Sequence, residues 1–176
     1  MKPEIKIGLL TGLGVCAWVL GEFALGFHTT RLELGRYTGY GAVAIPVAGI
    51  WLALRGRRTR QGGWLAFGEG FRAGMTVSVL CAVIAAVFLA AYNQIINPGW
   101  MQNAWKLEKA RLERAGATEQ QLAKQETLMK LSGSALGPFV LELPRTVMMG
   151  MVITVAGALA LRREREDVPA APERAG

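Results

Sequence analysis

Four long apolar blocks alternate with polar and charged segments along the chain. Each block approaches the length of about 20 residues that an α-helix, rising about 1.5 Å per residue, needs to cross the bilayer core. Membrane-spanning strands would require shorter segments of alternating polarity, which the blocks do not show. The pattern predicts an all-α, polytopic membrane protein with a single four-helix domain over residues 1–163, whose transmembrane helices run over about 7–27, 37–54, 70–92 and 138–161.

The polar segment between the third and fourth blocks is also predicted to be helical. Pro98 ends the third helix, because the residue before a proline avoids helical geometry. Gly116 suits the C-terminal cap of a following helix, and Thr118 with Gln121 three residues later matches the capping box that opens another. We therefore expect an extracytoplasmic amphipathic helical hairpin over about 99–131, lying on the outer leaflet or on the outer end of the bundle.

The first helix of this predicted hairpin carries apolar residues roughly on one side. They are Met101, Trp105 and Leu112, and Trp100 begins the same segment. A partly apolar helix outside the membrane needs a surface to cover it. Trp100, Trp105 and Leu112 are therefore candidate contact residues of the outer hairpin.

Arginines favour one side of the predicted bundle. Four lie within residues 55–60 and three within residues 162–165, whereas the loop after the first block carries two, within residues 31–36. By the positive-inside rule, we expect a multi-pass protein of a bacterial cytoplasmic (inner) membrane with both termini in the cytoplasm. The tail over residues 164–176, which combines prolines with small and charged residues, is typical of disordered chain.

The first block also has the general form of a signal peptide, since Lys2 and Lys6 precede an apolar stretch. Residues 22–27, however, offer no small-x-small cleavage site. We therefore favour a retained first transmembrane helix.

Composition narrows the function classes. Of 176 residues, 52% are hydrophobic and 19% charged, which together with the uneven distribution excludes a disordered chain and a disulfide scaffold. The net charge of +7 comes from basic residues that flank apolar blocks, so we expect lipid headgroups rather than nucleic acid as the counter-charge. One histidine, His28, and two cysteines, Cys16 and Cys81, cannot build a usual metal or haem site. We expect no metal, cofactor or catalytic residues, and no enzyme activity.

Three ionisable residues inside the blocks form the candidate site. Glu22 lies in the outward half of the first predicted helix, and Glu142 and Arg145 lie in the outward half of the fourth, so all three share one depth. Charge within a membrane is costly and is usually paired or functional. Glu22 could pair with Arg145 and leave Glu142 as a second acceptor or proton carrier. The alternatives are that the three side chains snorkel to the interface, or that they serve transport or catalysis.

Two further features concern helix packing. Gly8 with Gly12, and Gly70 with Gly74, are small residues at four-residue spacing, which lets helix backbones approach closely. We favour packing within one bundle over homodimerisation. Pro46 interrupts the second predicted helix and predicts a kink there.

Several local motifs resemble a known family. They are the sequence Tyr-Asn-Gln-Ile-Ile-Asn-Pro-Gly-Trp at residues 92–100, the entry to the third helix at residues 67–74 and the turn at residues 115–118. Together they are similar to the bacterial membrane family known as domain of unknown function number 4199. The resemblance covers nearly the whole chain and implies four membrane helices with the hairpin between the last two. It implies no activity.

The sequence leaves three hypotheses of function. An interaction or assembly subunit is favoured by the small size, the packing glycines and the outer hairpin, with the protein itself or another membrane protein as partner. A small transporter or channel subunit would use the charge cluster. A lipid-binding or lipid-modifying membrane protein is the third, although no catalytic constellation supports modification.

Overall fold

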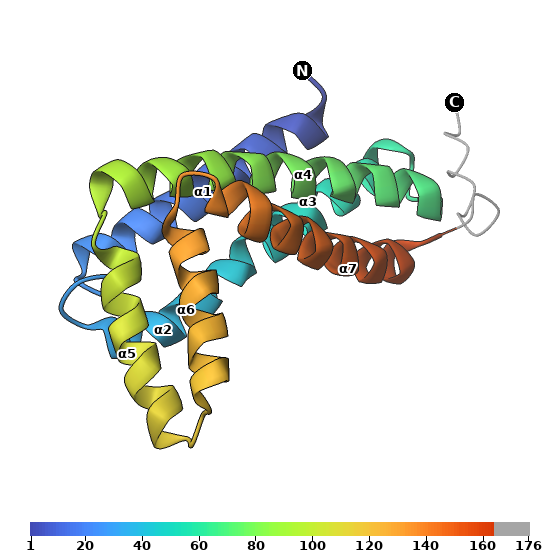
Figure 1. Cartoon of the computed structure of the whole chain (residues 1–176). Helices are drawn as coiled ribbons and strands as arrows, with labels where there is room; N and C mark the ends of the chain where they lie inside the picture. Colours follow the sequence, from blue (N-terminus) through green and yellow to red (C-terminus); the bar gives the residue numbers. More distant parts are fainter. Residues whose placement is uncertain (164–176) are drawn as a thin grey trace, which may run out of the picture.

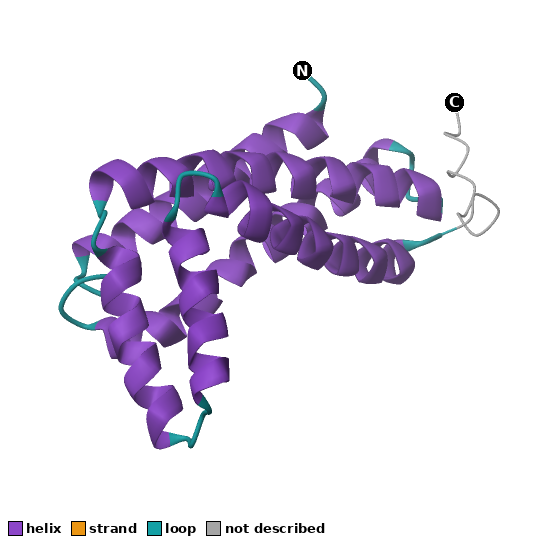
Figure 2. Ribbon diagram, in the orientation of Figure 1, coloured by secondary structure: helices purple, strands orange, loops and turns teal. Residues whose placement is uncertain are grey.

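The computed structural model describes residues 1–163, which are helical and contain no extended strand (Figure 2). The tail predicted to be disordered, residues 164–176, lies outside the described residues. In chain order the helices and helical turns are α1 (Pro3–Ala24), α2 (Leu32–Thr38), η1 (Gly39–Val43), α3 (Ala44–Arg60), α4 (Phe67–Ala91), η2 (Tyr92–Ile96), α5 (Trp100–Arg114), α6 (Glu119–Gly133), η3 (Pro138–Glu142) and α7 (Leu143–Leu161).

Among the described residues, four helical segments are long and apolar enough to cross a membrane, which confirms the predicted number. They are Pro3–Ala24, Leu32–Arg60, Phe67–Ile96 and Pro138–Leu161. The first begins before the predicted residue 7, because proline is tolerated at the first helical position, where its missing N–H would have no partner. All four are as expected of a multi-pass membrane protein.

The second span is less regular than its uninterrupted apolar block predicts. α2 passes through η1, a tighter 3₁₀ turn, into α3. Pro46 is the third residue of α3 and so lies in the first turn, where a backbone N–H has no partner within the helix. The irregularity therefore lies immediately before Pro46 rather than at a kink within the helix.

α4 is the central helix of the bundle and packs against α1, α3 and α7 (Figure 1). Its buried positions are mostly small, which allows three neighbouring backbones to approach it. These buried residues are Gly70, Ala73, Gly74, Val77, Ser78, Cys81, Ala82, Ala85 and Ala86. Larger side chains fill the space between α3 and α4, where Ile50, Leu54 and Leu65 form the core with Val77.

Glycines mark the closest helix contacts. A Cβ at Gly12 of α1 would lie 2.8 Å from a side-chain carbon of Ile84 on α4, and one at Gly74 would lie 2.5 Å from Thr154 Cγ2 on α7. Gly8 and Gly70 are similarly crowded by neighbours in this same chain. Both predicted glycine pairs therefore contribute to packing within one bundle, which is the interpretation that the sequence analysis favours.

Charged side chains tie three helices together at the end of the bundle that holds the start of α1. The buried carboxylate of Glu4 accepts a hydrogen bond of 2.6 Å from Arg60 Nη2 and lies 3.5 Å from Arg57 Nη1. Arg57 also lies 3.5 Å from Glu69 on α4. Two of the arginines assigned to lipid headgroups are thus paired with carboxylates of the protein.

α5 and α6 lie side by side and extend away from the other end of the bundle (Figure 1). The turn between them contains Gly116, whose φ of 79° is a left-handed conformation that glycine adopts without strain. The capping box predicted at α6 is confirmed, because Thr118 Oγ1 accepts from the Gln121 N–H while Gln121 Oε1 accepts from the Thr118 N–H.

We predict that Gly74→Ala destabilises the bundle whereas Gly21→Ala does not. The added methyl at residue 74 would collide with Thr154, whose side chain is fully buried, and overpacking of this kind costs about 1–3 kcal/mol. Gly21 lies in α1 with nothing within 4 Å of its added Cβ, so helix propensity there favours alanine by about 0.5–1 kcal/mol. Thermal unfolding of the detergent-solubilised variants measures both. Equal melting temperatures would contradict the α4–α7 packing.

Candidate functional site

A buried polar cluster lies where α1 and α4 end, at the end of the bundle from which α5 and α6 extend. Glu22 is in the last turn of α1, His28 follows in the loop, and Tyr92 opens η2 directly after α4. The residue exposures are only 6% for Glu22, 5% for His28 and 0% for Tyr92. Burying a polar group is costly unless it is hydrogen-bonded. The hydrogen-bond partners of these side chains therefore indicate which groups the site could accept.

Two hydrogen bonds and one longer polar contact link the cluster into a chain. Tyr92 Oη lies 2.6 Å from His28 Nδ1, and His28 Nε2 lies 3.5 Å from Glu22 Oε2. Asn97 Nδ2 donates to Tyr92 Oη at 3.2 Å. With a carboxylate facing Nε2, a neutral His28 carries its proton on Nε2, and Nδ1 accepts from the tyrosine hydroxyl.

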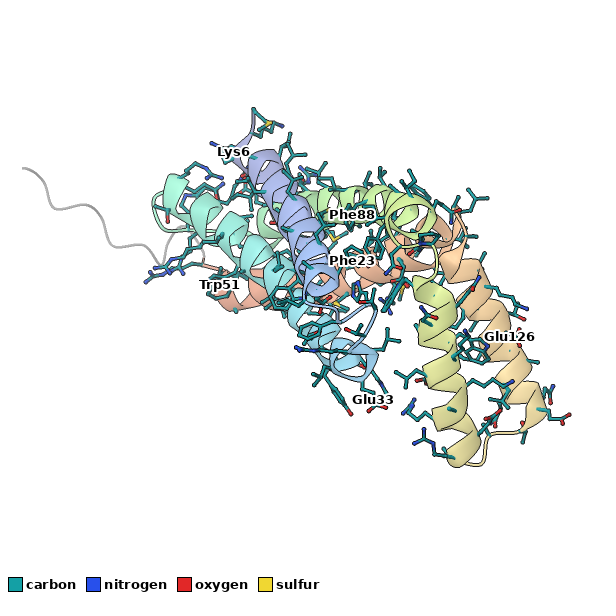
Figure 3. All side chains as sticks on the ribbon, turned by 90° about the vertical axis from the view of Figure 1, so that its left-hand side faces the viewer. Lys6, Phe23, Glu33, Trp51, Phe88 and Glu126 are labelled. Carbon is teal, nitrogen blue, oxygen red and sulfur yellow. The ribbon has the colours of Figure 1, made fainter. Side chains whose placement is uncertain are left out.

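Aromatic rings fix this chain in place. Phe23 and Phe88 each lie with their ring centroid 5.9 Å from that of Tyr92, and both side chains occupy the same end of the bundle (Figure 3). The Trp100 ring centroid is 4.2 Å from that of His28. The enclosed rings keep the Tyr92 hydroxyl directed at the imidazole.

Two π-helical turns supply the rest of the site. η2 presents Tyr92 and Asn93 at the end of α4, and η3 precedes α7 and ends at Glu142. Asn93 Nδ2 donates to the Ser132 carbonyl at 3.1 Å, which joins η2 to the end of α6. A π-turn is rare and is often found at functional sites, because its wider ring changes the direction in which the following side chains project.

These elements surround a cavity of about 350 Å³. Its lining combines the buried Glu22, His28, Tyr92 and Asn93 with charged residues on other elements, namely Arg36, Glu142 and Arg145. Within the described part of the chain, Glu22 Oε1 and Asn93 Oδ1 are buried and accept no hydrogen bond. Glu22 and Asn93 both line the cavity, and each keeps a buried acceptor without a donor, which is energetically costly.

The structure places all three predicted charged residues around this one cavity, but with different pairing. Arg145 Nη2 donates to Glu142 Oε2 at 2.6 Å, on its own helical turn, and its side chain is 71% exposed. Glu22 faces His28 instead. The pairing of Glu22 with Arg145 that equal depth suggested is therefore not the arrangement observed.

The predicted contact residues of the segment over 99–131 are all half-buried. Trp100 packs on His28 and belongs to the cavity. Trp105 lines a second cavity, of about 420 Å³, between α5 and α6. Leu112 lies further along α5. Trp100 thus contributes to the polar site rather than to a free outer surface.

Sequence reasoning missed three members of the site. The sequence singles out His28 only as a metal ligand that lacks partners, Tyr92 as an aromatic residue at the outer boundary and in a motif resembling a family, and Asn93 only as part of that motif. The available signal was that this motif places several polar side chains directly after an apolar span, where they meet the loop that follows the first span.

Burial also determines the charge state of His28. It lowers the pKa of the imidazole below the ordinary value of 6.5, and the neighbouring Glu22 carboxylate only partly offsets this effect. A neutral imidazole is a hydrogen-bonding neighbour of Glu22 rather than a compensating cation.

The comparisons with known proteins identify a family without adding an activity. The model of a family described as protein of unknown function (DUF4199) matches residues 6–163. The chain belongs to this family, as its motifs indicated. No curated protein and no solved structure matches it.

The site predicts a specific pH dependence of stability. Because folded His28 binds a proton less tightly than the unfolded chain does, stability is full above about pH 6.5 and falls as the pH drops through that value toward the lowered pKa. We expect the melting temperature in detergent to fall between about pH 7.5 and about pH 5.5. His28→Gln removes the titrating imidazole and should flatten this part of the curve. A melting temperature that rises on acidification would contradict a neutral His28.

Proposed function

We propose that this member of the family is a multi-pass protein of a bacterial inner membrane that works by binding rather than by catalysis. It is a small interaction subunit whose cavity at the ends of α1 and α4 holds the positively charged, hydrogen-bond-donating group of a ligand. The observation that carries this proposal is the buried Glu22 carboxylate, whose Oε1 has no donor among the described residues.

Energetics favour a bound cation over an empty site. Leaving a buried polar acceptor without a donor costs about 1–3 kcal/mol, and more for a charged group. Glu22 Oε1 and Asn93 Oδ1 both carry this cost, and both line the same cavity. A ligand that donates to the two atoms recovers this free energy, which is the physical basis of its affinity.

Transport is the second candidate, because Glu22 and His28 are ionisable groups buried beside a membrane-spanning bundle. Further along the bundle, however, α1 and α4 are in tight contact, with Gly12 against Ile84 and Gly8 against Leu80. This packing favours a ligand held at one end over a path through a single bundle.

The proposed orientation places both termini and the α3–α4 loop in the cytoplasm and the α5–α6 pair outside. It is supported by the excess of arginines at the ends of α3 and α7. The cavity then opens at the outer leaflet, since Glu22 and Tyr92 lie near the outer ends of their spans.

We predict that Ala115→Cys, in the turn between α5 and α6, reacts with a membrane-impermeant maleimide on intact spheroplasts, whereas Thr59→Cys near the α3–α4 loop reacts only after lysis. Both residues are exposed, and the chain's own thiols, Cys16 and Cys81, are buried and give a low background. The opposite labelling pattern would invert the orientation.

We predict that ethylammonium binds the solubilised protein through Glu22. At matched ionic strength and a concentration several times its Kd, it should raise the melting temperature by about 2–4 °C. Glu22→Gln removes the negative charge with little change of shape and should abolish the rise.

Glu119→Gln, at an exposed position in the first turn of α6, is the matched control and should respond like the wild type. The absence of a Glu22-dependent shift in melting temperature would refute the proposed binding site. Glu22-dependent uptake of labelled ethylammonium into proteoliposomes would assign transport in place of binding alone.

A further inference from the structure

We infer that the ligand of this cavity is the ethanolamine-phosphate headgroup of a membrane phospholipid, with its ammonium at Glu22 and Asn93 and its phosphate at Arg36 and Arg145. The inference rests on the proposed function and names the chemical class that the site recognises.

The first argument is the charge pattern of the cavity lining. Two carboxylates, Glu22 and Glu142, and two guanidinium groups, Arg36 and Arg145, line one cavity, while His28 is held neutral by burial. Such a lining has no net charge but carries both signs, which complements a zwitterion better than a simple cation or anion. Arg36 and Arg145 are exposed, so the phosphate lies at the rim, and Glu22 is buried, so the ammonium lies within.

The second argument is the number of unsatisfied acceptors. Glu22 Oε1 and Asn93 Oδ1 both require donors. A primary ammonium carries three N–H groups, enough to supply a donor to each of two acceptors. A choline headgroup has the same charge but no N–H, so it would leave both acceptors unsatisfied.

The third argument is depth in the membrane. Glu22 and Tyr92 lie near the ends of the spans Pro3–Ala24 and Phe67–Ile96, where the polar headgroup region begins. Val19 and Leu89 line the same cavity, and each lies about one helical turn closer to the bilayer centre. Polar lining at headgroup depth above apolar lining at acyl-chain depth matches a lipid rather than a soluble zwitterion.

The size and aromatic lining of the site also suit this headgroup. Its volume of about 350 Å³ falls at the lower end of the range of small-molecule sites. Trp100 and Tyr92 contribute aromatic rings to the lining, and such rings favour a neighbouring ammonium.

The test compares two lipids that differ only in their ammonium group. Short-chain phosphatidylethanolamine and phosphatidylcholine are titrated against the solubilised full-length protein, and bound lipid is counted by native mass spectrometry. We expect phosphatidylethanolamine to bind about tenfold more tightly, because only it satisfies the buried acceptors. This comparison uses the wild-type protein and so does not depend on the folding of any variant.

Two kinds of variant separate the two parts of the headgroup. Glu22→Gln should reduce the preference for phosphatidylethanolamine to nearly none. Arg36→Gln and Arg145→Gln should weaken the binding of both lipids by about threefold to tenfold, because both lipids carry the phosphate. The ratio of the two affinities should not change. Arg114→Gln, an exposed arginine of α5 outside this cavity, is the control and should change neither affinity.

Each remaining outcome gives a definite answer. Equal affinity for the two lipids, with a Glu22-dependent response to ethylammonium, would overturn the headgroup assignment and leave the proposed function standing. Absence of both responses would overturn the two together. Soluble O-phosphoethanolamine binding as tightly as the lipid would show that the occupant is a free zwitterion and overturn the assignment to a lipid.

Discussion

The close approach of α4 to its three neighbours is the constraint on which the rest of the structure depends. In a bilayer, apolar side chains gain nothing by leaving lipid, so helices associate through tight packing and polar contacts. Gly74 of α4 contacts Thr154 of α7, and Ser78 of α4 contacts Gly150 of α7. In each contact, a glycine on one helix leaves room for a hydroxyl side chain on the other. This packing sets the position of α4 along the bundle. It therefore also determines the position of Tyr92, which directly follows α4.

The two ends of the bundle use polar groups in different ways. At the end that holds the start of α1, Glu4 is buried but paired with Arg60 and Arg57, so its charge is compensated within the chain. At the other end, the carboxylate of Glu22 faces a neutral imidazole and keeps one oxygen unsatisfied. Loss of Arg57 or Arg60 would leave the Glu4 carboxylate uncompensated, whereas the open oxygen of Glu22 is already without a partner among the described residues.

The sequence predicted those features that depend on local properties. Four spans follow from apolar length, and the capping box from the spacing of Thr118 and Gln121, because each is determined within a few turns of helix. Depth along the helix axis, read from the rise per residue, grouped Glu22 with Arg145, and both residues line one cavity. Depth does not give the rotation of each helix about its own axis. It therefore could not show that the Arg145 side chain pairs with Glu142, three residues before it. His28 and Tyr92 are 64 residues apart, and only tertiary packing brings them together.

The polar chain at the cavity also has a direction. With the proton of neutral His28 on Nε2, Asn97 donates to Tyr92, Tyr92 donates to His28, and the Nε2 proton faces the Glu22 carboxylate. Every N–H and O–H dipole in the series therefore points the same way, with the carboxylate at the accepting end. Hydrogen bonds aligned in this manner polarise one another, so the amide of Asn97 is coupled through the Tyr92 hydroxyl to His28. A change as distant as that amide would therefore alter the polarity of the imidazole that faces Glu22.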